Sequence, residues 1–159
     1  MRRGIFDMKR KLRIYLDSSV VSALFDDRNP ERRLLTESFF RIIGDFDVYV
    51  SEFVVAEIVR TPDTVLRDRM AQAIARFSLL PTAEEATELA AKYLLYGAVP
   101  GSYPEDAHHI AVAVIEEMDF LLSWNFTHLV RRKTRDVVKM VNTLNGLKPI
   151  EIITPAELL

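Results

Sequence analysis

The chain has 159 residues, of which 49% are hydrophobic and 28% are charged, and its net charge is −2. This composition is typical of a folded globular protein with a substantial core, and we expect residues 1–159 to form one domain. The absence of cysteine excludes disulfides and thiolate metal sites, and no apolar run approaches the length of a membrane span. The N-terminal stretch also lacks the apolar segment of a secretory signal, so we expect a cytoplasmic protein that does not bind a membrane.

Positive charge is concentrated in two places. Residues 1–13 carry six Lys or Arg against one Asp, and residues 131–139 carry five against one. Such concentrations attract phosphate groups. A basic N-terminal tail over residues 1–11 and one solvated helix face also explain them, and for either cluster taken alone we prefer this explanation.

Strands and helices alternate in the first half of the chain. Alternating apolar positions predict a strand at residues 12–16, followed at once by a short helix that begins near Ser18. Residues 29–45 carry apolar side chains at the helical period, with a proline near the start of the helix that they predict. A strand at residues 47–51 is followed directly by a helix over residues 52–60.

The second half continues the alternation. The stretches "DTVLRDRMAQAIARF" and "TAEEATELAAKYLLYG" predict two helices on either side of a short strand, "SLLP". A loop rich in glycine and proline leads into the helix "EDAHHIAVAVIEEM", the strand "DFLLS", the helix "RRKTRDVVKMVNTLNG" and the last strand, "IEIIT". This order predicts an α/β protein, a three-layer α/β/α sandwich with a mainly parallel central sheet of four to five strands.

Polar residues lie where ligands of such sheets bind, which is at the carboxyl ends of the strands. Asp17 directly follows the first strand, and Glu57 lies in the helix after the second. Asp106 begins the helix before "DFLLS", and Asn125 lies just beyond that strand. If the three carboxylates converge, they repel one another unless a cation neutralises them. Oxygen ligands suit Mg²⁺ or Mn²⁺, and such sites commonly hydrolyse phosphodiester bonds.

Each acid also has a simpler explanation. Asp17 has the position of a helix cap, and Glu57 lies between apolar residues on a short helix, where an exposed face is the commoner place for an acid. Asp106 is favoured in a first helical turn by the helix dipole. Spacing alone therefore leaves the metal site and these structural roles open.

Four stretches occur in the order found in one known family. They are "IYLDSSVVSALF", "VYVSEFVVAEI", "PEDAHHIAVAVIEEMDFLLSWNFTHL" and "GLKPIEIITPAEL". With them the chain resembles the PIN-domain ribonucleases, in particular the VapC-like toxins of type II toxin–antitoxin systems. The resemblance implies a PIN-like fold and a Mg²⁺- or Mn²⁺-dependent endoribonuclease that acts on RNA. It also implies a cognate antitoxin protein as a partner, and a homodimer.

The resemblance assigns roles to individual residues. Asp17, Glu57 and Asp106 match the family's metal-binding and catalytic acids. Ser18 and Ser123 match supporting hydroxyl positions. Asn125 falls where many members have a further catalytic aspartate. An asparagine can offer a carbonyl oxygen to a metal or its water, but it removes one negative charge.

The segments beside these residues offer weaker candidates. His108 and His109 are adjacent, so on a helix they point about 100° apart and do not easily share one ion. We expect one to pack against the sheet and the other to face solvent, although either can contact the scissile phosphate or orient Asp106. Trp124 and Phe126 flank Asn125, where packing is the commoner use and base stacking the alternative. The candidate RNA contacts of the second basic cluster are Arg131, Arg132, Lys133 and Arg135.

Two other functions compete with the nuclease. A receiver-like phosphoacceptor domain needs adjacent acids after its first strand and a lysine after a late strand, whereas serines follow Asp17 and the late strands lack that lysine. A catalytically weak or inactive PIN-like module that binds RNA or protein has its main support in Asn125. The presence of all three acids argues against it.

Overall fold

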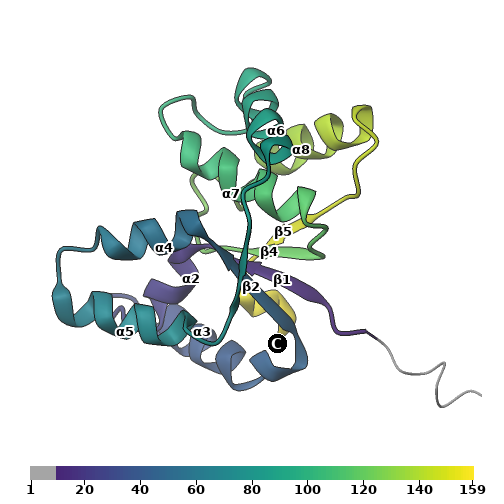
Figure 1. Ribbon diagram of the computed structural model, residues 1–159. Helices are drawn as coiled ribbons and strands as arrows, with labels where there is room; N and C mark the ends of the chain where they lie inside the picture. Colours follow the sequence, from purple (N-terminus) through teal and green to yellow (C-terminus); the bar gives the residue numbers. More distant parts are fainter. Residues whose placement is uncertain (1–9) are drawn as a thin grey trace, which may run out of the picture.

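Strands and helices alternate through the described part of the chain, as the sequence predicts (Figure 1). The computed structural model describes residues 10–159, so nearly all of the predicted basic tail lies outside the described residues. Within this range the five strands are β1 (Arg13–Leu16), β2 (Asp47–Ser51), β3 (Ser78–Leu80), β4 (Phe120–Leu122) and β5 (Glu151–Ile153). The seven α-helices are α2 (Ser18–Ala23), α3 (Pro30–Arg41), α4 (Glu52–Val59), α5 (Thr64–Ile74), α6 (Glu84–Leu95), α7 (Pro104–Ile115) and α8 (Arg132–Leu144).

All five strands are parallel, in the order β3-β2-β1-β4-β5. The central strand, β1, pairs through Ile14 with Val48 of β2 and through Leu16 with Leu122 of β4. Its apolar residues are fully buried because helices cover both faces of a parallel sheet. The predicted α/β fold with a central parallel sheet is therefore confirmed.

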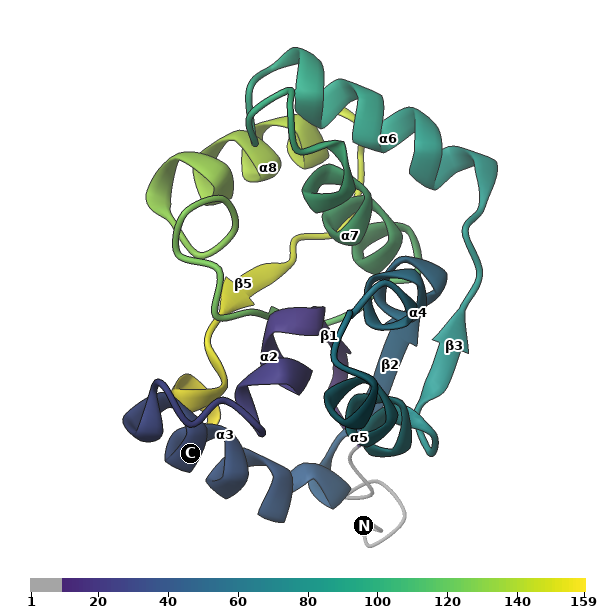
Figure 2. The ribbon, with the colours of Figure 1, turned by 90° about the vertical axis from the view of Figure 1, so that its left-hand side faces the viewer.

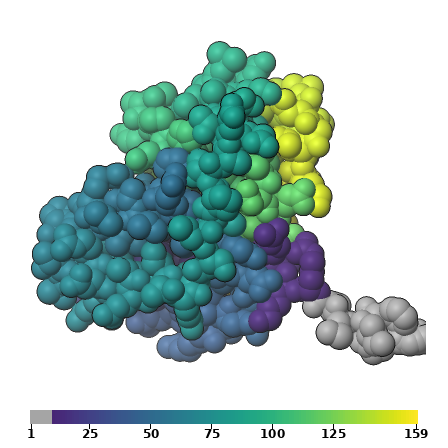
Figure 3. Space-filling model, viewed as in Figure 1, coloured from purple at the N-terminus to yellow at the C-terminus, as the bar shows by residue number. Residues whose placement is uncertain are grey.

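The helices form two layers around the sheet. Figures 1 and 2 show α6, α7 and α8 on one side, and α2 and α3 on the other together with the 3₁₀ turn η2 (Pro155–Leu158). Packing agrees with the views, since α6 contacts α7 and α8, and α3 contacts η2. The space-filling view shows the teal segment around β3 along the front of the molecule, where β3 forms an edge of the sheet (Figure 3).

Local capping explains where several helices begin. The Asn29 side chain accepts a hydrogen bond from the Arg32 N–H at the start of α3, and Pro30 occupies the first turn. Asp63 caps α5 in the same way. Between residues 10 and 159, no helix is long and apolar enough to cross a bilayer.

The carboxyl edge of the sheet is polar although it is buried. Asp17, Ser51, Ser123 and Thr154 stand at the ends of four different strands, and all four are buried. Buried polar groups need hydrogen-bond partners, so this edge must contain a bonded network. Helix α4 contacts α2 and α7, and it brings one more acid to the same edge.

Candidate active site

A cleft at the carboxyl edge of the sheet collects the predicted acids. Asp17 after β1, Glu57 in α4 and Asp106 in the first turn of α7 line a cavity of about 340 Å³, together with Asn125. Three segments that lie far apart in the sequence thus meet at one place, as the strand-end rule predicts.

Asp17 is held by serines. It has the N-cap position of α2 but makes no capping hydrogen bond, so the simple capping explanation is wrong. Its Oδ2 atom accepts hydrogen bonds from the Ser19 hydroxyl at 2.9 Å and the Ser123 hydroxyl at 2.6 Å. The Oδ1 atom faces the buried ring of His109, whose Nε2 lies 3.9 Å away. The two shorter serine hydrogen bonds therefore fix Oδ2, while Oδ1, with only a longer contact of 3.4 Å from the Ser18 hydroxyl, is directed at the centre of the cluster.

Glu57 points into the cleft. Its side chain is 24% exposed, and Oε1 accepts hydrogen bonds from the Ser18 hydroxyl at 2.7 Å and from His109 Nε2 at 3.2 Å. The alternative of an exposed helix face is therefore wrong for this residue. Burial alone would raise the pKa of Glu57, but the hydrogen bond and charge of His109, together with Ser18, outweigh it and lower the pKa.

The two adjacent histidines point in different directions as expected, but His108 does not face solvent, and His109 lies at the site. His108 is half-buried and stacks on Phe53, with ring centroids 4.9 Å apart. His109 is fully buried, and its Nδ1 lies 2.6 Å from the Tyr15 hydroxyl. Burial disfavours a charged His109, but Glu57 and Asp17 more than compensate, so its pKa is raised. His109 orients Glu57, not Asp106.

Asp106 has a partner that sequence analysis missed. Its Oδ2 atom lies 2.8 Å from Nδ1 of His128, over which the Tyr103 ring packs at 4.2 Å. Burial raises the pKa of Asp106, and the negative charge of Asp17 raises it further, while the hydrogen bond with His128 opposes both. The only sequence signal for His128 is its place three residues after Asn125.

The family follows from a comparison of the sequence. The sequence model of the PIN domain matches residues 14–125, a stretch that includes all three acids of the cleft. The chain belongs to the PIN domain family. No curated protein matches it significantly.

Two solved structures share the fold of this PIN domain. VapC20 of Mycobacterium tuberculosis, described as a toxin that cleaves the sarcin-ricin loop, is 17% identical with a TM-score of 0.55. That similarity covers 72% of this chain and 92% of VapC20. VapBC2 of Rickettsia felis, solved with a DNA fragment from its promoter, is 9% identical with a TM-score of 0.57, over 89% of this chain and 97% of the other.

Asn125 shapes a turn of the PIN domain. Its Oδ1 atom accepts hydrogen bonds from the backbone N–H groups of Thr127 at 3.1 Å and His128 at 2.9 Å. A carbonyl oxygen has two lone pairs, and here both are engaged. This oxygen, which the sequence suggested as a metal ligand, therefore stabilises the turn that places His128 beside Asp106.

Ser123 joins Asp17 to this turn. Its fully buried hydroxyl donates to Asp17 Oδ2 and accepts the N–H of Asn125 at 2.9 Å. Replacing Ser123 with alanine should cost about 1–2 kcal/mol of unfolding free energy, because the buried Asp17 carboxylate loses a donor and the half-buried N–H of Asn125 loses its acceptor. It should also weaken the binding of any divalent ion at Asp17 about tenfold, because Ser19 is then the only short hydrogen bond that fixes Oδ2 within residues 10–159. Urea unfolding and metal titration test this, with Ser78→Ala on the exposed edge strand as the control; equal effects of both changes would contradict it.

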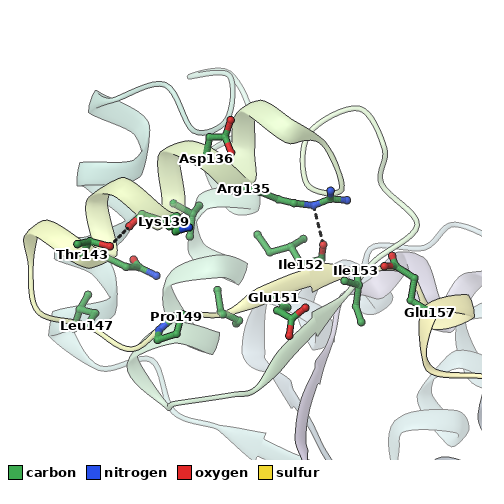
Figure 4. A pocket seen from close by; sticks show the side chains of 13 residues that line it. Arg135, Asp136, Lys139, Thr143, Leu147, Pro149, Glu151, Ile152, Ile153 and Glu157 are labelled. Atoms are coloured by element: carbon green, nitrogen blue, oxygen red, sulfur yellow. Dashed lines mark hydrogen bonds between the residues drawn. The ribbon is translucent and has the colours of Figure 1, made fainter.

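The basic segment of the PIN domain is partly used for structure. Arg131 donates to the backbone carbonyl of Ala98 at 3.2 Å, and Arg135 donates to that of Ile152 at 3.0 Å. Figure 4 shows Arg135 in a different cavity, of about 640 Å³, between α8 and β5. These two arginines help to fix α8, which leaves Arg132 and Lys133 as the better candidates for RNA contact.

Proposed function

We propose that this protein is a metal-dependent endoribonuclease that hydrolyses RNA at the cleft formed by Asp17, Glu57 and Asp106. The observation that carries the proposal is the convergence of these three carboxylates at the carboxyl edge of a PIN-domain sheet. Carboxylates held this close need a cation, and the donors present suit a divalent ion.

The residues of the cleft fit such an ion. Ligand atoms of Asp17, Glu57 and His109 all lie within 4.8 Å of one another. Asp106, bound to His128, stands beside this group on the wall of the cleft. When bound, Mg²⁺ or Mn²⁺ supplies an activated water and stabilises negative charge on the phosphoryl and leaving oxygens. Asp17 and Glu57 would hold the ion, and Asp106 would bind the ion or its water through the oxygen that is not hydrogen-bonded to His128.

The surroundings of the cleft suit unpaired RNA. Trp124 is buried, and its indole N–H donates to Thr36, so it serves packing. Phe126 is 51% exposed next to Asn125, with the guanidinium of Arg32 5.7 Å from its ring centroid. An exposed aromatic ring beside a cation can stack on a base and contact the adjacent phosphate, which requires a single-stranded or looped substrate.

Phe126→Ala should weaken the binding of single-stranded RNA about tenfold, because one stacking partner is lost. Metal affinity should stay unchanged, since within residues 10–159 the Phe126 ring contacts Trp124 and Arg32 and makes no hydrogen bond with Asp17, Glu57 or Asp106. Fluorescence anisotropy with a labelled RNA in Ca²⁺ measures the affinity without cleavage. Leu144→Ala, at an exposed position near the end of α8, is the control. An equal loss in both variants would argue against a stacking role.

We further propose that the protein is the toxin of a toxin–antitoxin pair and forms a homodimer. The likeness in fold to VapC20 and VapBC2 supports this role. Expression of the wild type should arrest growth, expression of Asp17→Asn should not, and co-expression of a small protein encoded beside the gene should restore growth. Growth arrest by both proteins would favour the alternative, a PIN-like module that acts by binding RNA or protein. The observation that supports this alternative is that the Asn125 carbonyl oxygen already accepts two backbone hydrogen bonds.

Incubation with mixed structured RNAs tests the enzymatic proposal. The wild type and Asp106→Asn are compared in Mg²⁺, Mn²⁺ and EDTA, since asparagine keeps the size of the side chain and can still bond to His128. Cleavage that needs metal and falls sharply in the variant supports the proposal. Equal cleavage by both proteins would contradict the assigned site. No cleavage by the folded wild type would contradict the proposed activity.

A further inference from the structure

One nitrogen atom points into the carboxylate cluster. Nε2 of His109 lies 3.2 Å from Glu57 Oε1 and 3.9 Å from Asp17 Oδ1. The ring is fully buried on α7, so it cannot swing out to solvent. Neither acid is bound by a lysine or arginine side chain among residues 10–159, so His109 is the one cationic or nitrogen group in contact with them.

The other side of the ring is held by a relay of hydroxyls. Nδ1 lies 2.6 Å from the Tyr15 hydroxyl, which lies 2.6 Å from the Ser51 hydroxyl, and Ser51 accepts the N–H of Phe53. Tyr15 and Ser51 are both fully buried. A histidine that binds a metal typically has its second nitrogen fixed in this way, because that bond sets the tautomer and the ring orientation.

The distances match those between neighbouring ligands of one ion. Ligands at about 2.1 Å from an octahedral ion lie about 3.0 Å apart when adjacent and about 4.2 Å apart when opposite. The two distances from His109 Nε2 lie between these values. In the metal-free protein Nε2 donates to Glu57; an ion bound there would displace this proton to solvent, with the remaining ring proton on Nδ1 directed at the Tyr15 hydroxyl. Asp106 is bound to His128 instead, so it does not compete with His109 for this place.

We propose that His109 Nε2 is a metal ligand together with Asp17 Oδ1 and Glu57 Oε1, and that this mixed nitrogen and oxygen site takes first-row transition ions in preference to Mg²⁺. The proposal rests on the metal site of the proposed function and specifies its donors. Mg²⁺ favours oxygen ligands alone, whereas imidazole suits transition ions, whose affinities rise from Mn²⁺ to Co²⁺. An ion held only by the three acids would show the same order more weakly, so the direct detection of a bound nitrogen decides between the two donor sets.

Metal binding without RNA tests the proposal. Mg²⁺, Mn²⁺ and Co²⁺ are titrated calorimetrically into the wild type, His109→Gln, Tyr15→Phe and His128→Asn. Pulsed electron paramagnetic resonance of the Mn²⁺-loaded proteins then detects whether a nitrogen is bound. We expect wild type to bind Mn²⁺ and Co²⁺ at least about tenfold more tightly than Mg²⁺ and to show ¹⁴N coupling. His109→Gln should lose the coupling and reduce the preference.

The other two variants keep the test decisive if His109→Gln fails to fold. Tyr15→Phe keeps the ring but frees Nδ1, so it should retain ¹⁴N coupling and weaken Mn²⁺ binding about tenfold. His128→Asn should keep both the coupling and the affinity, and loss of the coupling there would make His128 the ligand and overturn the proposal. Mn²⁺ binding by the wild type without ¹⁴N coupling would also overturn it, while leaving a carboxylate site and the proposed nuclease intact. Failure of the wild type to bind any of the three ions would overturn both.

Discussion

Asp17→Asn should reduce RNA cleavage by roughly a thousandfold while the protein stays folded. Asp17 directs Oδ1 at the cluster, and its replacement would remove a charged ligand of the proposed ion. Such a ligand stabilises the transition state by several kcal/mol, and a thousandfold effect corresponds to about 4 kcal/mol. Asparagine keeps the size of the side chain, and its carbonyl oxygen can still accept from Ser19 and Ser123. The unfolding free energy without metal should therefore change by no more than about 1 kcal/mol. Single-turnover cleavage in Mn²⁺ and urea unfolding measure the two effects.

A matched acid at the opposite edge of the sheet serves as the control. Asp119 accepts the backbone N–H of Arg13 at 2.8 Å and pairs with Arg10, so it has a structural role far from the carboxyl ends of the strands. Asp119→Asn should cost some stability but keep metal-dependent cleavage. If Asp17→Asn retained cleavage within a few fold of wild type, Asp17 would not belong to the reaction centre.

Divalent metal should stabilise the folded protein markedly. The proposed ion would bind ligands that only the fold brings together, so at about 100 times its dissociation constant it should add about 2.7 kcal/mol to the unfolding free energy. For a domain of this size, that corresponds to a rise in Tm of roughly 5–10 °C. Differential scanning calorimetry with Mn²⁺, and again after excess EDTA, measures the rise and its reversal.

The same measurement on Asp17→Asn separates specific binding from a general salt effect. The variant should show little or no rise in Tm, because one charged ligand is missing. Equal stabilisation of wild type and variant would mean that the ion binds elsewhere, and no stabilisation of either would contradict the presence of a metal site.

The sequence predicted the fold and the meeting of the acids because both depend on order along the chain. Strands that alternate with helices form a parallel sheet, and the carboxyl ends of parallel strands lie at one edge. The position of Asp17 could be predicted from the strand that precedes it. The roles of Glu57 and Asp106 were predicted from the resemblance to PIN domains. The environment of Glu57 was harder to predict. Glu57 lies between apolar residues on a short helix, and this pattern does not reveal which face of the helix meets α7.

The finer chemistry depends on side-chain directions that spacing does not fix. Which of His108 and His109 turns toward the acids is decided by the rotation of α7 on the sheet. The contact of His128 with Asp106 depends on a turn closed by Asn125, and a turn of this kind has no periodic signal. The same turn engages the carbonyl oxygen that the sequence alone left available to a metal.

The chemistry of the RNA ends tests the central claim most directly. A metal-activated water that attacks phosphorus and expels the 3′ oxygen leaves a 5′ phosphate and a 3′ hydroxyl, whereas attack by the ribose 2′ hydroxyl leaves a 2′,3′ cyclic phosphate. A defined RNA is cut by the wild type in Mn²⁺, with EDTA and Asp17→Asn as parallel reactions, and the product ends are mapped by enzymatic labelling and mass spectrometry. We predict 5′ phosphate and 3′ hydroxyl ends that appear only with metal and intact Asp17. Cyclic phosphate ends, or cleavage that persists in EDTA, would contradict a metal-dependent hydrolysis at this cleft.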